Sequence, residues 1–365
     1  MPNKITSPDA EERALLVQAI IGRQNIGEAA DSIAELERLA NTAGVRSLGS
    51  ITQRRDRPNA SFFIGQGKLA EIQLACRESG ANLIIFDNDL SPVQVNNLDL
   101  AIGVKVIDRT ELILQIFARR ARTAEAQIQV ELAQLQYLAS RIPVSRKQHR
   151  FTGGIGMRGP GESPFQLRRA PMMTRITVLK RKLREMQKRR ERTRERRPWP
   201  LISLVGYTNA GKSTLLNTLT AAEAFVDNRL FATLDTKSRL LYLAPNLKVM
   251  LTDTVGFIRH LPHGLVASFR STLEEIRESD LLLIMAEASH PYVRDHLKIV
   301  HETLAEMQAD KIRRLLLMNK ADQLNDRTGL ERDYPGAIFI SALNKGGLSE
   351  LKEQIAAIIS LENRQ

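Results

Sequence analysis

Cysteine and long apolar runs are nearly absent from this sequence. Cys76 is the one cysteine among 365 residues, which excludes an internal disulfide and is typical of a reducing compartment. No stretch approaches the ~20 apolar residues of a membrane span, and residues 1–10 do not have the charged-then-apolar layout of a signal peptide. We therefore expect a cytoplasmic, monomeric protein without a membrane span.

Aromatic residues are also scarce, at 5% of the chain, and the six histidines are scattered without the spacing of metal ligands. This distribution gives no reason to expect a zinc site. The composition is otherwise that of a globular protein, because 43% of the residues are hydrophobic and 26% are charged. A chain of this length has room for two or three domains.

Acidic residues are scarce in residues 168–197, where basic residues are abundant. Residues 168–197, called the basic arm below, hold fourteen Lys or Arg and three Glu, and the whole chain has a net charge of +12. Apolar residues recur in it at helical spacing: Met172, Ile176, Leu179, Leu183 and Met186. The pattern predicts a helix with a narrow apolar seam and a basic outer face. Since a merely solvated face would mix its charges, a polyanionic partner is favoured.

A second segment can cover the apolar seam. From Leu114 to Ile142, apolar residues recur every three or four positions, which predicts one long helix and, with the basic arm, a long antiparallel helical hairpin. The tip loop between them, 143–165, is rich in glycine and basic residues and has little to bury. It is either a flexible linker or a loop that enters folded RNA. For the second role, the guanidinium planes of its arginines and the ring of Phe151 could stack on unpaired bases.

The first ~110 residues alternate short apolar runs with helical patterns. Strands are expected at 14–21, 45–51, 62–64, 83–86 and 104–107, with helices near 31–42, 68–79 and 92–100. The alternation predicts a small parallel α/β domain. Residues 65–68 and 87–89 lie at expected strand ends, where α/β sheets often bind ligands. Ordinary turn chemistry explains these residues better than a second nucleotide site does, because the glycine turn is too short to be diagnostic.

A glycine-rich turn directly follows the apolar run at 201–205. Its residues are Gly206, Tyr207, Thr208, Asn209, Ala210, Gly211, Lys212, Ser213 and Thr214. In a phosphate loop of this spacing, the glycines let backbone N–H groups close around phosphate, the lysine reaches the β- and γ-phosphates, and the serine hydroxyl holds Mg²⁺. The sequence therefore predicts a site for a nucleoside triphosphate and Mg²⁺.

Three later motifs indicate which nucleotide is bound. Asp253 follows an apolar run, where its carboxylate would hold the metal through water and the amide of Gly256 would lie near the γ-phosphate. The second motif contains Asn319, Lys320 and Asp322, which come after a further apolar run at 315–318. The carboxylate of Asp322 can accept hydrogen bonds from the N1–H and the amine of guanine together, and adenine has no such donor pair. Ser341 and Ala342 could contact the guanine carbonyl through their backbone N–H groups. The motifs predict GTP and GDP as ligands.

The switch residues suggest slow turnover. Thr233 lies between the first two motifs, where a switch threonine would bind Mg²⁺, although a loop threonine without that role is nearly as common. Phe257 follows Gly256, and a phenyl ring cannot orient an attacking water. With Lys212, Thr233 and Gly256 as the catalytic candidates, we expect slow intrinsic hydrolysis and a partner that orders the site.

The chain resembles the HflX family of ribosome-associated P-loop GTPases. The resemblance rests on five segments: 63–68, 104–110, 129–135, 153–162 and 253–257. It implies a factor that binds the large ribosomal subunit near the peptidyl-transferase region and splits stalled or stressed ribosomes. ATP binding by the N-terminal region is also implied by the resemblance.

Several positions depart from the family pattern. Pro164 and Pro171 are gained after the tip loop, and because proline suits only the first turn of a helix, we expect the second arm to begin near Pro171. The 234–239 segment of the switch is altered, and Glu287 stands where relatives carry Asp. These changes leave the tip contacts and the switch behaviour open.

The combined prediction is an α/β chain of three domains. These are an N-terminal parallel α/β domain (1–110), the helical hairpin (111–197) and a doubly wound GTPase domain (198–361). The predicted function is GTP hydrolysis with Mg²⁺ on the large ribosomal subunit, the basic arm and tip loop contacting its RNA. The alternatives are an RNA-binding scaffold that holds GTP structurally, and an ATP-driven enzyme centred on the N-terminal domain.

Overall fold

The computed structural model describes residues 11–23, 25–141, 164–194, 198–220, 230–231, 237–259 and 275–362. The chain divides into two compact units, one formed by residues 1–119 with 128–184 and the other by 120–127 with 185–365. Among the described helices, none is long and apolar enough to cross a membrane.

The first unit is built on a four-stranded parallel sheet. Its strands are β1 (Arg13–Ile21), β2 (Arg46–Arg55), β3 (Leu83–Phe86) and β4 (Lys105–Asp108), in the order β2-β1-β3-β4. All three pairings are parallel, and β3 is buried along its whole length, as expected when helices cover both faces of a parallel sheet. The predicted small parallel α/β domain is confirmed.

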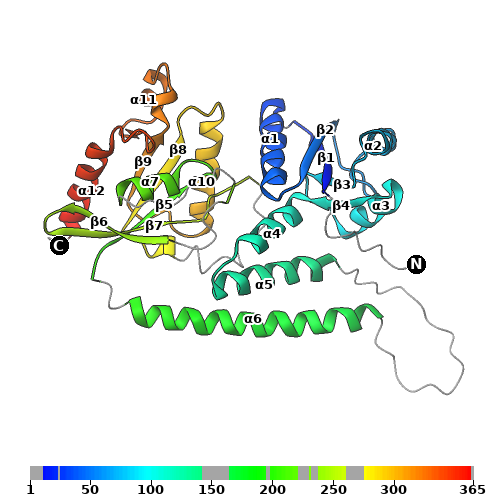
Figure 1. Ribbon diagram of the computed structural model, residues 1–365, viewed down its shortest axis with the longest axis horizontal. Coiled ribbons are helices and arrows are strands. Elements are labelled where there is room, and N and C mark those ends of the chain that lie inside the picture. Colours follow the sequence, from blue (N-terminus) through cyan, green and yellow to red (C-terminus); the bar gives the residue numbers. More distant parts are fainter. Residues whose placement is uncertain are drawn as a thin grey trace, which may run out of the picture. The chain divides into compact units, whose positions relative to one another are not determined.

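Four helices accompany this sheet. They are α1 (Ile26–Thr42), α2 (Gln66–Ser79), α3 (Pro92–Ile102) and α4 (Arg109–Arg120). Helix α1 lies on one face of the sheet and α2 and α3 on the other (Figure 1). Local sequence explains the helix ends: Ser91 and Gln94 form a capping box at the start of α3, and Gly80 ends α2 in the left-handed conformation.

The strand expected at 62–64 is wrong. The backbone there makes a turn, in which the Asn59 side chain accepts hydrogen bonds from the N–H groups of Ser61 and Phe62. Phe63 has a φ of 66°, which no strand residue adopts. The short apolar run is instead packed against the core of the sheet, so its hydrophobicity reflects burial rather than strand pairing.

The helical hairpin consists of α5 (Ala124–Arg141) and α6 (Pro164–Arg194), which lie side by side (Figure 1). Its small core contains Leu132, Ala139, Ile176 and Leu179, with Ile128, Leu135 and Leu183 packed against it. The predicted seam of the basic arm is thus covered by the predicted partner segment. The tip loop at 143–165 lies almost entirely outside the described residues.

Two details of the hairpin prediction are wrong. The first arm is not one helix, because α4 ends at Arg120 and Thr123 begins α5 by accepting a hydrogen bond from the N–H of Ala126. The second arm does not begin near Pro171, which lies inside α6. A proline removes only one backbone hydrogen bond from a helix of 31 residues, and this loss does not stop the helix.

Helix α5 is fixed to the end of β4 by a buried carboxylate. The Tyr137 hydroxyl donates to Asp108 Oδ1 at 2.7 Å, and Arg141 forms an ion pair with Asp108. Burial raises the pKa of Asp108 although Arg141 opposes this, and burial together with Asp108 raises the pKa of Tyr137 above its ordinary value. The end of α5 that precedes the tip loop is therefore held by charge and hydrogen bonds.

The second unit contains a six-stranded mixed sheet. Its strands are β5 (Leu201–Gly206), β6 (Lys237–Ala244), β7 (Leu247–Asp253), β8 (Leu281–Glu287), β9 (Arg314–Asn319) and β10 (Ile338–Phe339). The order is β10-β9-β8-β5-β7-β6, with β6 antiparallel at the edge. The other strands are parallel, so their carboxyl ends meet at one edge of the sheet, where α/β folds bind ligands.

Helices cover both faces of this sheet. Residues of α7 (Lys212–Leu219) and α12 (Leu348–Glu362) join one apolar core with the strands, and α10 (Val293–Glu306) lies on the other side (Figure 1). Two shorter elements follow β9, the 3₁₀ turn η1 (Ala321–Gln323) and the helix α11 (Thr328–Asp333). The predicted doubly wound fold is confirmed.

Candidate functional site

The glycine-rich turn lies between β5 and α7, and two of its glycines cannot be replaced without a clash. Gly206 has a φ of 155° and a Cβ there would collide with the carbonyl oxygen of Met285. Gly211 has a φ of 95° and a Cβ there would collide with the side-chain amide of Asn319. These glycines let the loop curl close to β8 and β9, as a loop that presents backbone N–H groups to a phosphate must do.

Lys212 is held inside this loop. Its side chain is only 6% exposed, and Nζ donates to the carbonyl oxygens of Gly206 and Tyr207 at 3.0 and 2.8 Å. Burial lowers the pKa of Lys212 to about 8, although the charge of Asp253 opposes the shift. A buried cation beside two neutral carbonyls is the arrangement that an anionic phosphate would complete.

Ser213 and Asp253 bring together the predicted metal ligands. Asp253 is fully buried at the end of β7, and the Ser213 hydroxyl donates to its Oδ2 at 2.6 Å. A hydroxyl and a carboxylate are hard oxygen donors of the kind that Mg²⁺ takes beside a phosphate, so these residues fit the ion. Thr233, the third predicted ligand, lies outside the described residues.

The segment 256–259 is joined to the phosphate loop through its backbone. The N–H of Thr208 donates to the Phe257 carbonyl at 2.8 Å, and the N–H of Phe257 donates to the Gly206 carbonyl at 3.1 Å. A Cβ on Gly256 would lie 2.9 Å from both Lys212 Nζ and the Thr208 Cα. The ring of Phe257 is buried, at 2% exposure. The predicted γ-phosphate sensor is therefore in contact with the lysine, and the phenyl ring points into the protein.

Asn319 connects the phosphate loop to the loop after β10. Its Nδ2 donates to the Ala210 carbonyl at 2.8 Å, and its Oδ1 accepts from the N–H of Ala342 at 2.9 Å. Asn319 is 2% exposed. One buried side chain thus sets the spacing between the loop predicted to hold phosphate and the loop predicted to contact guanine.

Asp322, the residue predicted to bind guanine, and its neighbour Lys320 are held by contacts with residues outside the predicted motifs. Asn344 Nδ2 donates to Asp322 Oδ2 at 3.1 Å. Lys320 has a φ of 60°, and its Nζ lies 2.8 Å from Glu287 Oε2. Lone polar residues in a loop or at a strand end have no motif of their own, so only their position in the fold reveals the contacts.

The other ligand candidate was the strand-end segment of the first unit. Asp87 forms a buried ion pair with Arg109 at 2.7 Å and accepts hydrogen bonds from Ser32 and Gln18. Burial opposes the ionisation of Asp87, but these partners hold its pKa below the usual value. Asn88 is bonded to the backbone of Ala19. These contacts account for the side chains within the unit and favour the structural interpretation.

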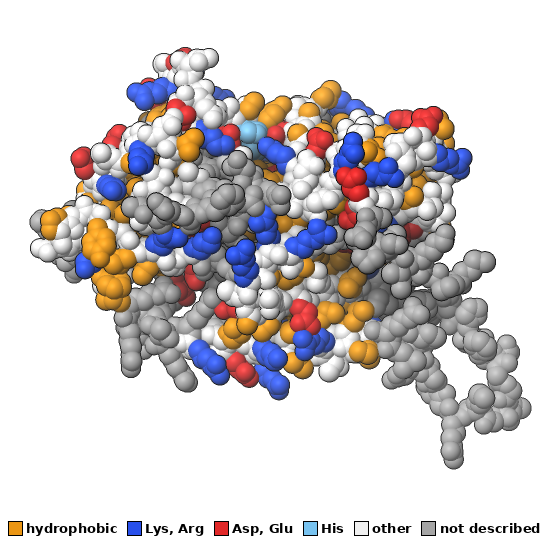
Figure 2. Space-filling view, in the orientation of Figure 1, with side chains coloured by type: hydrophobic (Ala, Val, Ile, Leu, Met, Phe, Trp, Pro, Cys, Tyr) orange, Lys and Arg blue, Asp and Glu red, His pale blue; other side chains and the backbone are white. Residues whose placement is uncertain are grey.

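Basic side chains are exposed along the described part of the basic arm. They include Lys180, Arg181, Lys182, Arg184, Lys188 and Arg189, and basic side chains are visible along α6 in Figure 2. Arg175, nearer the start of the helix, is engaged in a two-point ion pair with Glu131 of α5. The outer face of α6 thus has the positive charge that a phosphate backbone would require.

Three family models match consecutive parts of the chain. They describe a GTP-binding GTPase N-terminal region at 30–118, a GTP-binding GTPase middle region at 120–197, and a 50S ribosome-binding GTPase at 201–320. The third match contains the phosphate loop, Asp253 and Asn319. These residues therefore belong to a GTPase domain.

Curated relatives match nearly the whole of this chain and most of their own length. The chain is 45% identical to GTPase HflX of Caldanaerobacter subterraneus subsp. tengcongensis, over 94% of this chain and 80% of the relative, and 42% identical to GTPase HflX of Escherichia coli, over 98% and 85%. A GTP-binding protein from the archaeon Sulfolobus solfataricus in complex with GDP has a similar fold, with a TM-score of 0.50, 25% identity, and coverage of 96% of this chain and 99% of that chain.

Proposed function

The chain belongs to the HflX family of GTPases, and from that premise we propose that it hydrolyses GTP on the large ribosomal subunit in order to split or recycle stalled ribosomes. The observation that carries the proposal is the phosphate loop, in which buried Lys212 lies beside Gly256 and Ser213 beside Asp253. This geometry supports phosphoryl transfer to water. A ribosome-directed factor of this kind would act in the cytoplasm.

Five residues of the site have defined parts in the proposed reaction. Lys212 stabilises negative charge that develops on the transferred phosphate, and the amide of Gly256 donates to it. Ser213 and Thr233 would hold Mg²⁺ directly and Asp253 through water. A bound Mg²⁺ would supply positive charge that offsets the charge of the phosphates.

Selection of guanine is proposed to lie at the ends of β9 and β10. Asp322 accepts from the guanine N1–H and amine, while the backbone N–H groups of Ser341 and Ala342 donate to its carbonyl. Asn319 keeps these loops at a fixed distance from the phosphate loop through its bonds to Ala210 and Ala342. ATP would leave the carboxylate of Asp322 without donors and is rejected on that account.

Binding to ribosomal RNA is proposed for the basic arm and the tip loop. The support is the exposed basic side chains of α6 and the match of residues 201–320 to a family described as 50S ribosome-binding. Because Phe257 is buried and cannot orient water, the free protein should turn over slowly. Contact with the subunit is then needed to order the remaining switch residues.

Steady-state hydrolysis of GTP and ATP, with and without purified large subunits, tests this function. We expect a slow GTP rate that rises at least about tenfold with subunits, and no comparable ATP rate, because a partner that orders one catalytic group lowers the barrier by more than ~1.4 kcal/mol. Lys212→Ala should abolish the stimulated rate while leaving the α6 surface intact.

The buried Phe257 also favours a second candidate, an RNA-bound scaffold that holds GTP as a structural ligand. This scaffold would bind the subunit and GTP, yet its hydrolysis rate would not change with subunits. Binding without acceleration, measured on the same preparations, would replace the splitting function by the scaffold.

A further inference from the structure

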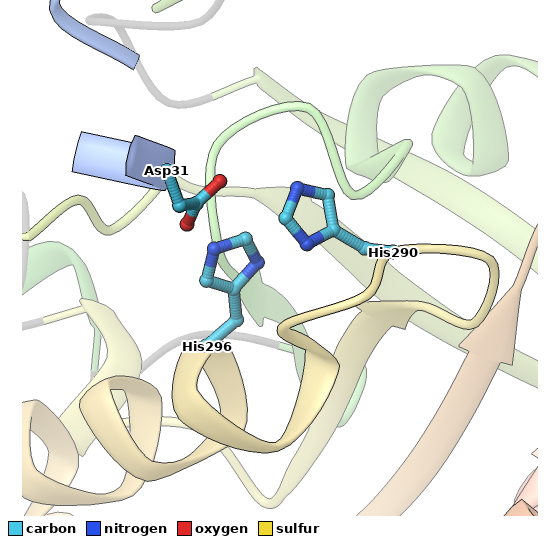
Figure 3. A group of neighbouring side chains, drawn as sticks. All are labelled: Asp31, His290 and His296. Atoms are coloured by element: carbon cyan, nitrogen blue, oxygen red, sulfur yellow. The ribbon is translucent and has the colours of Figure 1, made fainter. Parts of the chain in front are cut away.

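The side chain of Tyr207 turns away from the phosphate loop into the protein. It is 4% exposed, and its ring stacks on the imidazole of His296, with centroids 3.8 Å apart and an angle of 3° between the planes. His296 is on α10 and is also buried. Its ring lies 4.3 Å from that of His290, and Figure 3 shows these two imidazoles next to each other. The backbone of Tyr207 serves the loop, while its ring is held by α10.

The hydroxyl of Tyr207 reaches the segment that follows Gly256. It accepts a hydrogen bond from the backbone N–H of Arg259 at 2.9 Å. The two backbone bonds between 206–208 and Phe257 lie directly beside this contact. The segment 257–259 is therefore tied to the phosphate loop at three points, two through backbone atoms and one through a side chain.

We propose that Tyr207 is a positioning residue for GTP hydrolysis, because its hydroxyl fixes the segment 257–259 and so keeps Gly256 beside Lys212. This inference rests on the proposed function. Gly256 has no room to shift toward the loop, since a Cβ there would already approach Lys212 and Thr208 to 2.9 Å. It can only move outward, and the Tyr207–Arg259 bond opposes that movement from the far side of Phe257.

Packing alone does not require a tyrosine at this position. A phenylalanine would preserve the stack on His296 and the burial of the ring, but the N–H of Arg259 would lose its acceptor in a place where the residue is only 8% exposed. A buried N–H group without an acceptor destabilises the anchored conformation by a free energy comparable to that of a hydrogen bond. The segment should then leave its anchored position more often.

The test is Tyr207→Phe, with Tyr242→Phe as the matched control on an exposed tyrosine of β6. We expect Tyr207→Phe to lower kcat for subunit-stimulated GTP hydrolysis about fivefold, the change expected from one hydrogen bond, with GDP affinity unchanged. In the GDP complex, the Arg259 amide should exchange with solvent about fivefold faster. Tyr242→Phe should change none of these quantities.

The two readouts separate this inference from the function on which it rests. If the wild-type protein shows no stimulated hydrolysis, the proposed function fails, and faster exchange at Arg259 still supports the anchoring contact. An unchanged exchange rate overturns the inference. So does an unchanged or increased kcat in an active enzyme, or a loss of GDP affinity that accounts for the whole effect, because the tyrosine would then serve only nucleotide binding.

Discussion

Lys212 is a residue whose protonation depends on what fills the phosphate loop. In the structure, its buried ammonium faces two neutral carbonyls, and burial lowers its pKa from 10.5 to about 8. A phosphate next to the ammonium would favour the charged form and raise the pKa again. Nucleotide binding and proton uptake are therefore coupled at this side chain.

This coupling predicts a pH dependence of GDP affinity. Below pH 8 the free protein already carries the charged lysine, so affinity is constant. As pH rises through 8 the free protein loses the proton while the complex keeps it, and affinity should fall by up to about tenfold per pH unit. Titration of GDP between pH 7 and pH 9.5 at constant ionic strength measures the slope.

Lys212→Arg is the control for that titration, because a guanidinium stays charged across the whole range. Its GDP affinity will be weaker overall, but its profile should lack the decline that begins near pH 8. Ionisation of the guanine ring at more alkaline pH affects both proteins equally. Identical profiles for the two proteins would show that Lys212 does not titrate in this range.

Residues with a motif could be found from the sequence, and residues without one could not. Lys212, Asp253 and Asn319 each stand in a short motif typical of phosphate, metal or guanine sites, so a reader of the sequence can find them. The stack of Tyr207 on His296 joins positions far apart in the sequence. No local pattern encodes that contact, since it exists only when β5 and α10 are placed by the sheet.

At the scale of elements, periodicity predicted the hairpin but not where its helices begin and end. The apolar spacing continues across residues 121–123, yet α4 buries Leu114 and Phe117 within the first unit while α5 faces α6. The apolar residues of α4 and α5 recur at the same spacing, but the two helices pack against different elements. At Pro171 the local sequence predicted a helix end that does not occur. Helix α6 continues through the proline, because packing of its apolar seam outweighs the local preference.

Leu179 is the residue through which the stability of the hairpin can be tested. It is fully buried between α5 and α6, and Leu179→Ala would leave a cavity that the small core cannot fill. We expect a loss of ~2–5 kcal/mol in local stability, seen as faster amide exchange throughout α5 and α6. GDP affinity should not change, because the nucleotide site lies in the other unit.

Leu138→Ala on α5 is the matched control, since Leu138 is 47% exposed. Its effect should stay within about 0.5 kcal/mol. Equal effects of the two substitutions would mean that the seam does not hold the hairpin together. The two helices would then have to be held together by other contacts between them, such as the ion pair of Arg175 with Glu131.

At the scale of the whole molecule, the residues proposed for nucleotide chemistry and those proposed for RNA binding lie in different parts of the chain. The phosphate loop and the residues proposed to contact guanine belong to the second unit, whereas most of the described basic face of α6 belongs to the first. Substitutions in one part should therefore leave the basal property of the other unchanged. The proposed stimulation of hydrolysis by the ribosome would require both parts.

Salt dependence of subunit binding measures the contribution of the basic arm. With ~6 to 10 phosphate contacts, affinity should fall by ~10³ to 10⁵ between about 50 and 200 mM salt. Replacing Lys180, Arg181 and Arg184 by glutamine should weaken binding and flatten the slope of log K against log salt by about 0.9 for each phosphate that the variant no longer neutralises. Basal GTP hydrolysis without subunits should stay as in the wild type.

The control for that experiment removes the same charge elsewhere. Lys298, Lys311 and Arg332 are exposed on the second unit, and their replacement by glutamine lowers the net charge equally. If long-range attraction alone governs binding, both triple variants will lose affinity to the same extent. If α6 touches the RNA backbone, only the first variant will show a flatter slope, because counterions are released only where phosphates are neutralised.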